Sequence, residues 1–520
     1  MRTEEQLKQL MKVLSQGVFE KEHVLAMALL SAIAGESIFL LGPPGTAKSL
    51  VARRLKLAFK DGNAFEYLMS RFSTPDEIFG PVSISLLKNE DRYERVVDGF
   101  LPTATIVFLD EIWKASPSIQ NSLLTAINER IFQNGRSTIN LPMKALIAAS
   151  NELPAEDEGL EAMWDRFLVR MVSNCIQSEA TFYKMVRQQS FSTPVVDEDC
   201  QITEEQYHAW QQETGMVGIP DDICAVITAI RKGFKEETKK EEINEMDYYI
   251  SDRRWKKCVR LMQTSAFLNG RKHIDMTDIP ILMHCLWNKA ETIPMVIDVV
   301  GRSLTAHIDN KLTKLEKDIE QALKKASKPE KKEQNNRNMP KTFTLTHFFY
   351  YTLRNFKDGK CYFYKTDYNH ISVDTPSDGI IYKDEEKRAW IIHAIYTGAP
   401  FDYKARNQSN VKKIKLQKCK GGIIIDGTPY GFEREPGSAS MTDGLFGVDS
   451  FQMSNMATTA IDTIEKELRP QLLKLQDTFA KSKNMFLSDD DQKVVKKYLA
   501  RCDRHIEEVF VKAQNAQKLL

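Results

Sequence analysis

The segment Gly42-Pro43-Pro44-Gly45-Thr46-Ala47-Lys48-Ser49 constrains the fold more than any other part of the chain. It follows an apolar run, Ile38 to Leu41, and precedes a helix-forming run, Leu50 to Leu55. This order predicts a buried strand, a glycine-bearing loop and the N-terminus of a helix. The backbone N–H groups of such a loop converge on one point, and the helix dipole adds partial positive charge there. The segment therefore predicts a phosphate-binding loop.

Two side chains give this loop its chemistry. Lys48 can reach the β- and γ-phosphates of a nucleotide, and the Ser49 hydroxyl can coordinate Mg²⁺. The glycine that usually precedes the lysine is replaced by Ala47. Because this position should lie at the start of the helix, where φ is negative, we expect alanine to be tolerated. We assign nucleotide binding to the whole loop: Gly42, Pro43, Pro44, Gly45, Thr46, Ala47, Lys48 and Ser49.

A second signature supplies acidic and amide groups. The run Ile106 to Leu109 is apolar and is followed directly by Asp110 and Glu111. Both carboxylates should lie at the carboxyl end of a buried strand, where open α/β sheets bind ligands. We expect Asp110 to hold Mg²⁺, mostly through water, and Glu111 to polarise the attacking water. Asn151 follows another apolar strand and can position the same water, although a simple turn residue is the alternative.

Two further motifs carry arginines. Arg166 follows Asp165 and forms either a surface ion pair or a contact with the γ-phosphate on a neighbouring subunit. The pair Arg253-Arg254 begins a predicted helix that Ser251 or Asp252 would cap. One of these two arginines can fold back onto the nucleotide and sense its state. Arg253 is the first candidate and Arg254 the second.

Composition excludes several classes of protein. The formal net charge of +1 argues against a nucleic-acid protein that works through a bulk positive field. The eight cysteines include no CxxC pair, which suits a reducing cytosol. The N-terminal residues do not resemble a signal peptide, and the longest apolar stretch, Val24 to Ala34, is too short to span a bilayer. We therefore expect a cytoplasmic protein without a membrane span.

The pattern of elements predicts four structural regions. Short apolar strands alternate with helices up to about residue 180, which indicates a parallel sheet covered on both faces. Helices follow, including one from Thr277 to Lys289 that Thr277 or Asp278 would cap. A long helix from about 296 to 325 leads into a charged linker, for which a nucleic-acid patch is the alternative interpretation. The segments Thr342 to Leu345, Trp390 to Ile392 and Gly422 to Ile425 suggest a β-rich region, and two amphipathic helical stretches close the chain.

In this order, the motifs resemble the AAA+ ATPases of the MoxR family, and within it the regulatory ATPase variant A group. Besides the loop, the resemblance is carried by Phe108 to Lys114, Leu123 to Arg130, Ala149 to Pro154 and Ser251 to Lys257. It implies ATP or ADP with Mg²⁺ as cofactors. It also implies that Asn151 is sensor 1, that Arg166, or failing that Arg170, is the arginine finger, and that Arg253 is sensor 2. Ala before the lysine is common in the family's loop.

The resemblance also implies domain boundaries. We expect an α/β nucleotide-binding domain over residues 1–180 and a helical lid over 181–292. A triple-helical stalk would comprise 293–338 and 453–520, and it would be interrupted by a small β-rich, partner-binding domain over 339–452. The segment between Gly80 and Phe100 looks like the family's insertion in helix 2, and residues 131–145 look like its hairpin before sensor 1.

Two functions are compatible with this organisation. The first is a homo-oligomeric machine, expected to be a hexamer, that remodels partner proteins like a chaperone. The second is an ATP-gated scaffold whose β domain captures a partner enzyme without remodelling it. The family tends to work with a von Willebrand factor A domain protein. In enterobacterial relatives the β domain is implicated in binding inducible lysine decarboxylase, so an enzyme of that type is a further candidate partner.

Overall fold

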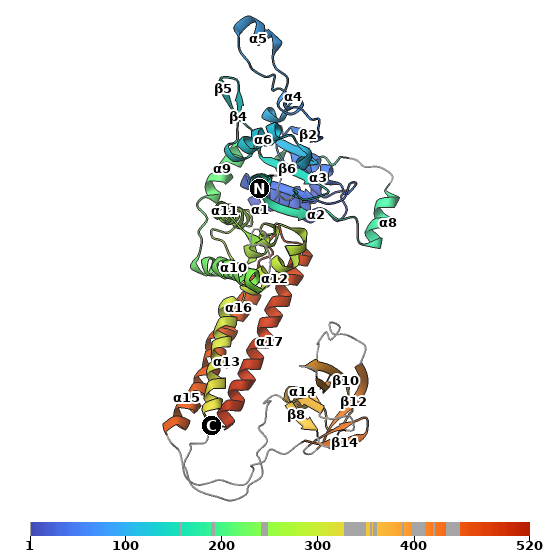
Figure 1. Cartoon of the computed structure of the whole chain (residues 1–520), viewed down its shortest axis with the longest axis vertical. Coiled ribbons are helices and arrows are strands. Elements are labelled where there is room, and N and C mark those ends of the chain that lie inside the picture. Colours follow the sequence, from blue (N-terminus) through green and yellow to red (C-terminus); the bar gives the residue numbers. More distant parts are fainter. Residues whose placement is uncertain are drawn as a thin grey trace, which may run out of the picture. The chain divides into compact units, whose positions relative to one another are not determined.

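The computed structural model describes residues 2–155, 159–188, 193–240, 248–326, 350–353, 356, 361–386, 389–396, 411–419, 422–432 and 448–519. The chain forms two units (Figure 1). The larger one comprises Met1–Lys328 with Gly447–Leu520, and the smaller one is Pro329–Phe446. The predicted strand from Thr342 to Leu345 and the part of the predicted linker beyond residue 326 lie outside the described residues.

A five-stranded parallel sheet is the centre of the larger unit, with strand order β2-β3-β6-β1-β7. Its strands are β1 (Ser37–Leu41), β2 (Ala64–Leu68), β3 (Ile106–Asp110), β6 (Ala145–Ser150) and β7 (Phe167–Val172). β1, β3, β6 and β7 are almost wholly buried, as near-continuous apolar runs in a parallel sheet should be. The predicted parallel α/β fold is confirmed.

Helices surround this sheet. They are α1 (Thr3–Leu14), α2 (Glu22–Ala34), α3 (Lys48–Lys56), α4 (Pro75–Phe79), α6 (Pro117–Glu129) and α7 (Glu161–Trp164), with short 3₁₀ turns at Leu101–Thr103 and Ile112–Lys114. Two further helices, α5 (Ile84–Glu90) and α8 (Glu179–Arg187), bury none of their residues and stand away from the sheet (Figure 1). α2 is apolar all round and buried, because it packs on the sheet as well as on α3 and α11 (Asp252–Leu268). The predicted hairpin is present as β4 (Ile131–Asn134) and β5 (Ser137–Asn140).

The lid follows the sheet in sequence. It contains η3 (Glu198–Cys200), α9 (Glu204–Thr214), α10 (Asp221–Lys240), α11, η5 (Met276–His284), η6 (Ala290–Thr292) and α12 (Ile293–Ser303). The predicted α-helix from Thr277 to Lys289 is wrong, because the segment is a 3₁₀ helix that ends at His284 and contains Pro280, which has no N–H to donate. Its cap is Asp275, whose carboxylate accepts from the Thr277 N–H at 2.8 Å.

Long helices extend from the lid. α13 (Ala306–Ala326) packs against α17 (Asp489–Leu519) and α15 (Val448–Thr463), and α17 also contacts α15 and α16 (Arg469–Lys481). The predicted single helix over 296–325 is wrong, because it is divided between Ser303 and Ala306. Thr305 directly precedes the second helix, and its hydroxyl donates to Asp309 in the first turn of that helix at 2.7 Å. A π-helical turn, Ile464–Leu468, joins α15 to α16 just before Pro470.

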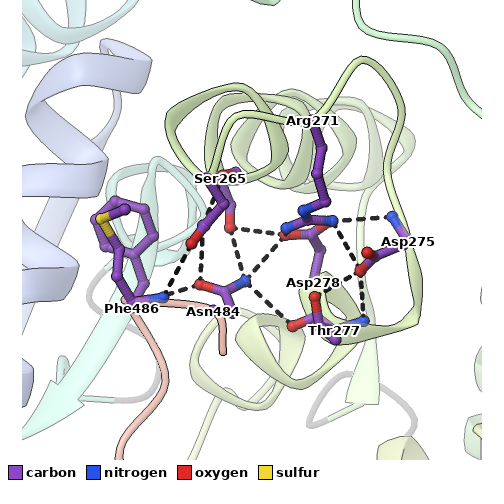
Figure 2. Close-up of polar contacts among 9 residues, drawn as sticks. Ser265, Arg271, Asp275, Thr277, Asp278, Asn484 and Phe486 are labelled. Atoms are coloured by element: carbon purple, nitrogen blue, oxygen red, sulfur yellow. Dashed lines mark hydrogen bonds and ion pairs between the residues drawn. The ribbon is translucent and has the colours of Figure 1, made fainter. Parts of the chain in front are cut away.

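The connection between α16 and α17 is anchored to the lid by a buried polar network (Figure 2). Asn484 Nδ2 donates to Ser265 Oγ at 2.9 Å, to the Thr277 carbonyl at 3.1 Å and to Asp278 Oδ1 at 3.0 Å. Asp278 is itself paired with Arg271 at 2.6 and 2.8 Å. A side chain from the C-terminal helices thus completes the hydrogen bonding of the lid.

The smaller unit is a mixed seven-stranded sheet with its own apolar core. The strand order is β14-β13-β12-β10-β11-β9-β8, and the described pairings are antiparallel except that of β9 with β11. The elements are β8 (Tyr350–Leu353), β9 (Cys361–Tyr364), α14 (Lys365–His370), β10 (Ser377–Glu386), β11 (Ala389–Tyr396), β12 (Val411–Cys419), β13 (Gly422–Ile425) and β14 (Thr428–Gly431). The predicted β-rich region is confirmed. In the part of the chain that the structure describes, no helix has the length and apolar character needed to cross a membrane.

Candidate functional site

The carboxyl ends of β1, β3 and β6 form the candidate site. β6 lies between the other two strands, and the parallel registers place Leu41 beside Ser150 and Asp110 beside Ala149. The residues that follow these strands, Gly42, Glu111 and Asn151, therefore emerge at one edge of the sheet. The structure thus brings together the loop, the two acids and the amide that the sequence singled out.

Close backbone contacts hold the loop in shape. A Cβ atom at Gly42 would lie 2.2 Å from the Ser173 carbonyl oxygen, so only glycine fits there. Gly45 has a φ of +81°, and a Cβ there would meet nothing within 4 Å, which leaves open space above the loop. The Lys48 ammonium donates to the carbonyl oxygens of Gly42 and Pro43 and so lies across the loop.

Ala47 corrects one expectation from the sequence. Its φ is +63° and its ψ is +26°, so it has the left-handed conformation and not the negative φ predicted for a helix start. An L-residue held there costs about 1–2 kcal/mol relative to the right-handed conformation. The following helix, α3, has no side-chain cap at its N-terminus. Its first N–H groups, with the loop amides before them, are therefore available to an anion.

The acidic pair lies beside this loop. Asp110 Oδ1 accepts from the Glu111 N–H at 3.1 Å, and Glu111 itself has a positive φ of +51°. Glu111 Oε2 lies 3.3 Å from the Lys114 ammonium and accepts from the Ser150 hydroxyl at 3.3 Å. Ser150 and Lys114 were not identified from the sequence. Ser150 could have been found from its place at the end of β6, next to the strand that carries the acids.

These residues suit a magnesium nucleotide. Backbone N–H groups and the Lys48 ammonium can receive phosphate oxygens. The Ser49 hydroxyl and the Asp110 carboxylate provide hard oxygen ligands of the kind that Mg²⁺ prefers. Asn151 is exposed at the same edge, where its amide can face bound water.

Arg166 lies at the amino end of a strand, opposite to the carboxyl ends that form the candidate site. It directly precedes β7, which runs parallel to β1 with Phe167 beside Ser37 and Val172 beside Leu41. The five residue steps along β7 correspond to about 16 Å, more than an arginine side chain spans. Arg166 donates to Asn128 Oδ1 at 2.9 Å and is half-exposed. It is therefore remote from the phosphate loop of its own chain.

The structure places Arg253 beside Arg166 and not at the phosphate loop. Its guanidinium donates to Asp165 Oδ2 at 2.8 Å, and the Ser251 hydroxyl donates to the same carboxylate. Burial acts to raise the pKa of Asp165, but these hydrogen bonds and the arginine charges hold it below its ordinary value. Burial, followed by the charge of Arg253, lowers the pKa of Arg166. In the structure the Arg253 guanidinium is therefore engaged by Asp165, and its role as a nucleotide sensor stays a prediction.

The alternative arginines have enclosed guanidinium groups. Arg170 stacks on the Trp164 ring, with 3.7 Å from Cζ to the ring centroid, and donates to Asn288 Oδ1 at 2.7 Å. Arg254 donates to the same Asn288 oxygen at 2.7 Å and to the Cys285 carbonyl at 2.9 Å. Burial lowers the pKa of both groups. The Arg170 side chain joins β7 to the lid, and that of Arg254 is bonded within the lid. Arg166 and Arg253 are therefore the members of each pair that a neighbouring molecule can reach.

Comparisons with known proteins agree with this geometry. The family profile described as "MoxR domain in the MoxR-vWA-beta-propeller ternary systems" matches residues 5–209, and that of an AAA lid domain matches residues 222–300. Two uncharacterized proteins of Methanocaldococcus jannaschii are similar. MJ0079 is 36% identical over 60% of this chain and 77% of its own length, and MJ0812 is 38% identical over 55% and 72%. The structural protein ORF618 of Acidianus two-tailed virus is 32% identical over 31% of this chain and 27% of its own length. Together with the parallel sheet and the lid, these matches show that the chain belongs to the MoxR family of AAA+ ATPases.

Proposed function

We propose that this protein hydrolyses ATP with Mg²⁺ to drive changes in partner proteins. The observation that carries the proposal is the convergence of three strand ends. The loop after β1 binds the phosphates through its amides and Lys48, and Ser49 and Asp110 hold Mg²⁺. Glu111 and Asn151 then orient water for attack on the γ-phosphate. Magnesium neutralises charge that develops on the phosphate oxygens.

We also propose that the site is shared between subunits. Arg166 precedes β7, about 16 Å of strand from the end next to the phosphate loop, and Arg253 is held beside it by Asp165. Both arginines then act on the nucleotide of a neighbour. The carboxyl ends of the strands in one subunit then supply the phosphate site. The amino end of β7 in the next subunit, with the adjoining part of its lid, supplies the finger and the sensor. Such a head-to-tail contact generates a ring when its rotation closes, which agrees with a hexamer.

Replacing Lys48 tests the nucleotide site. In Lys48→Ala the loop loses its ammonium group, and we expect nucleotide binding to weaken by at least about tenfold, since hydrogen bonds to charged groups are worth about 1.5–3 kcal/mol. Titration of a fluorescent ATP analogue measures this change. Lys56→Ala, at the end of the same helix, is the matched control and should bind as the wild type does. Unchanged binding in Lys48→Ala would refute the phosphate-site assignment.

The partner of this ATPase is proposed from the family and from the smaller unit. The matched profile is named for MoxR-vWA systems, which supports a von Willebrand factor A domain protein as partner. Residues 329–446 form a unit with its own buried core, which includes Phe363, Leu416 and Ile423. This separation supports the alternative function, in which the β-rich unit captures a partner under the control of ATP without remodelling it.

Deleting the smaller unit tests whether ATP hydrolysis and partner capture belong to separate units. We expect a chain in which a short Gly/Ser linker replaces residues 329–446 to hydrolyse ATP at the wild-type rate, because the catalytic residues and their supporting core all belong to the other unit. Steady-state phosphate release measures the rate, and a thermal melt verifies folding. A folded product without hydrolysis would show that the β-rich unit is part of the catalytic mechanism.

A further inference from the structure

Two histidines and an aspartate from three separate parts of the larger unit meet in one cluster outside the candidate nucleotide site. His23 comes from the first turn of α2, His284 from the end of η5, and Asp491 from the first turn of α17. His284 Nε2 lies 3.0 Å from Asp491 Oδ1, and His23 Nε2 lies 3.3 Å from Asp491 Oδ2. The two imidazole rings contact edge to face, with centroids 4.8 Å apart. The nucleotide-binding domain, the lid and the C-terminal helices each contribute one group.

One atom of this cluster lacks a hydrogen bond. His23 Nε2 is buried and, despite its proximity to the carboxylate, has no hydrogen-bond partner among the residues that the structure describes. The ring also bonds to the backbone of Phe486, which leaves Nε2 directed at the cluster. Burial, with the neighbouring His284, lowers the pKa of His23 to about 4. With the backbone bond fixing the ring, Nε2 is the atom that can present a lone pair to an ion.

The arrangement has the dimensions of a metal site. The nitrogen and oxygen atoms that can serve as ligands all lie within 4.8 Å of one another. Bonds of about 2.0–2.1 Å to Zn²⁺ place neighbouring ligand atoms of a tetrahedron about 3.4 Å apart, so a small approach of the side chains suffices. Asp491 Oδ2 also accepts from the Ser488 N–H at 2.9 Å and hydroxyl at 2.7 Å. The Ser488 bonds hold the carboxylate in place, as the outer partners of ligating carboxylates usually do, and Oδ1, which pairs with His284 Nε2, is the oxygen that can turn to an ion.

We propose that His23, His284 and Asp491 bind one divalent transition-metal ion of the zinc class. Neutral imidazoles and a carboxylate suit Zn²⁺, and three protein ligands leave the fourth position to water. The role of the ion is structural. It ties the N-terminus of α17 to both α2 and η5, and so fixes the base of the C-terminal helices to both parts of the ATPase module. Metal binding stabilises the folded state, because the three ligands converge only there.

The test uses the full-length chain, stripped with a chelator and kept free of nucleotide so that the phosphate site does not take up metal. After equilibration with Zn²⁺ and removal of excess, we expect about one bound equivalent by elemental analysis. His23→Gln and Asp491→Asn should each lose it. The matched control, His208→Gln, removes an exposed histidine on α9 that pairs only with Glu204 in the described residues, and should retain it. A wild-type chain that binds no stoichiometric zinc would overturn the proposal, as would variants that bind it equally well.

Co²⁺ spectroscopy on the wild type separates this site from a thiolate site and needs no variant to fold. Four-coordinate Co²⁺ with nitrogen and oxygen ligands gives d–d bands without sulfur charge-transfer bands. Strong charge transfer would assign the ion to the neighbouring buried pair Cys258 and Cys285 and would overturn the proposal. Added Zn²⁺ should also raise the thermal midpoint of the wild type but not that of Asp491→Asn. An equal rise in both would contradict the ligand assignment.

Discussion

Mixing two inactive variants, Glu111→Gln and Arg166→Ala, is expected to restore ATP hydrolysis. Each variant alone should bind ATP but turn it over slowly. Loss of the water-polarising carboxylate costs about 10²–10⁴-fold in rate. Loss of an arginine finger costs about 10³–10⁵-fold. The reason for restoration is the position of these residues at opposite strand ends of one sheet, which requires two chains to complete a site.

The expected size of the effect follows from random assembly. A restored site needs its own Glu111, supplied by an Arg166→Ala chain, and a neighbour's Arg166, supplied by a Glu111→Gln chain. In an equal mixture each condition is met half of the time, so about a quarter of the sites regain the full set of groups. Phosphate release should therefore rise to roughly a quarter of the wild-type rate, after the subunits have been allowed to exchange.

Two controls make this result interpretable. Arg501→Ala removes an exposed arginine on α17, and we expect it to be active alone and to give no gain in mixtures. Size-exclusion chromatography must show that both variants assemble as the wild type does. If the mixture stays as inactive as its components while assembly is intact, Arg166 does not act in a neighbouring site. Full activity of Arg166→Ala on its own would remove it from the mechanism.

The predicted site residues that the structure brings together are each local to one strand end in sequence. The loop from Gly42 to Ser49, the acids after β3 and the amide after β6 each follow a strand directly. Parallel strands bring their carboxyl ends to one edge without further information. Pattern and spacing are therefore sufficient to place them, and the structure adds only the neighbours of Glu111, namely Ser150 and Lys114.

The features of the site that the sequence did not predict depend on tertiary packing. The positive φ of Ala47 results from a loop held against the Ser173 backbone, a contact between residues far apart in the chain. The docking of the lid against β7 places Arg253 beside Asp165, and no motif encodes that surface. The enclosure of Arg170 depends on Trp164 and on Asn288 in the lid. Each of these features depends on the tertiary structure, because the residue that determines it lies far away in the sequence.

Replacing Asp278 is expected to have the largest effect on stability. This carboxylate is fully buried and accepts from Arg271, from Ser265 Oγ at 2.7 Å and from Asn484 Nδ2 at 3.0 Å. Asp278→Ala leaves these donors without their acceptor. Breaking a buried ion pair by removing one partner costs about 3–5 kcal/mol. We expect a value near the lower limit, because Arg271 is partly exposed and keeps Asp275 at 2.7 Å as a partner.

The matched control is Asp490→Asn, which removes an exposed carboxylate on α17 that pairs with Lys493. We expect it to unfold as the wild type does, since exposed ion pairs contribute little. Unfolding is followed in urea by the fluorescence of the six tryptophans, which include the buried Trp287 of the lid. A loss below about 1 kcal/mol in Asp278→Ala would show that water or the neighbouring groups satisfy the network unaided.

A double-mutant cycle identifies what the network connects. Asn484→Ala alone should cost about 1–3 kcal/mol, because Ser265 and Asp278 lose a donor in a buried setting. If Asn484 acts through Asp278, the double variant Asp278→Ala with Asn484→Ala should be less destabilised than the sum of the single variants by about 1 kcal/mol or more. Strict additivity would contradict a shared network. Coupling of this size would mean that the segment before α17 and the lid unfold as one body, since Asn484 and Asp278 lie 206 residues apart in the chain.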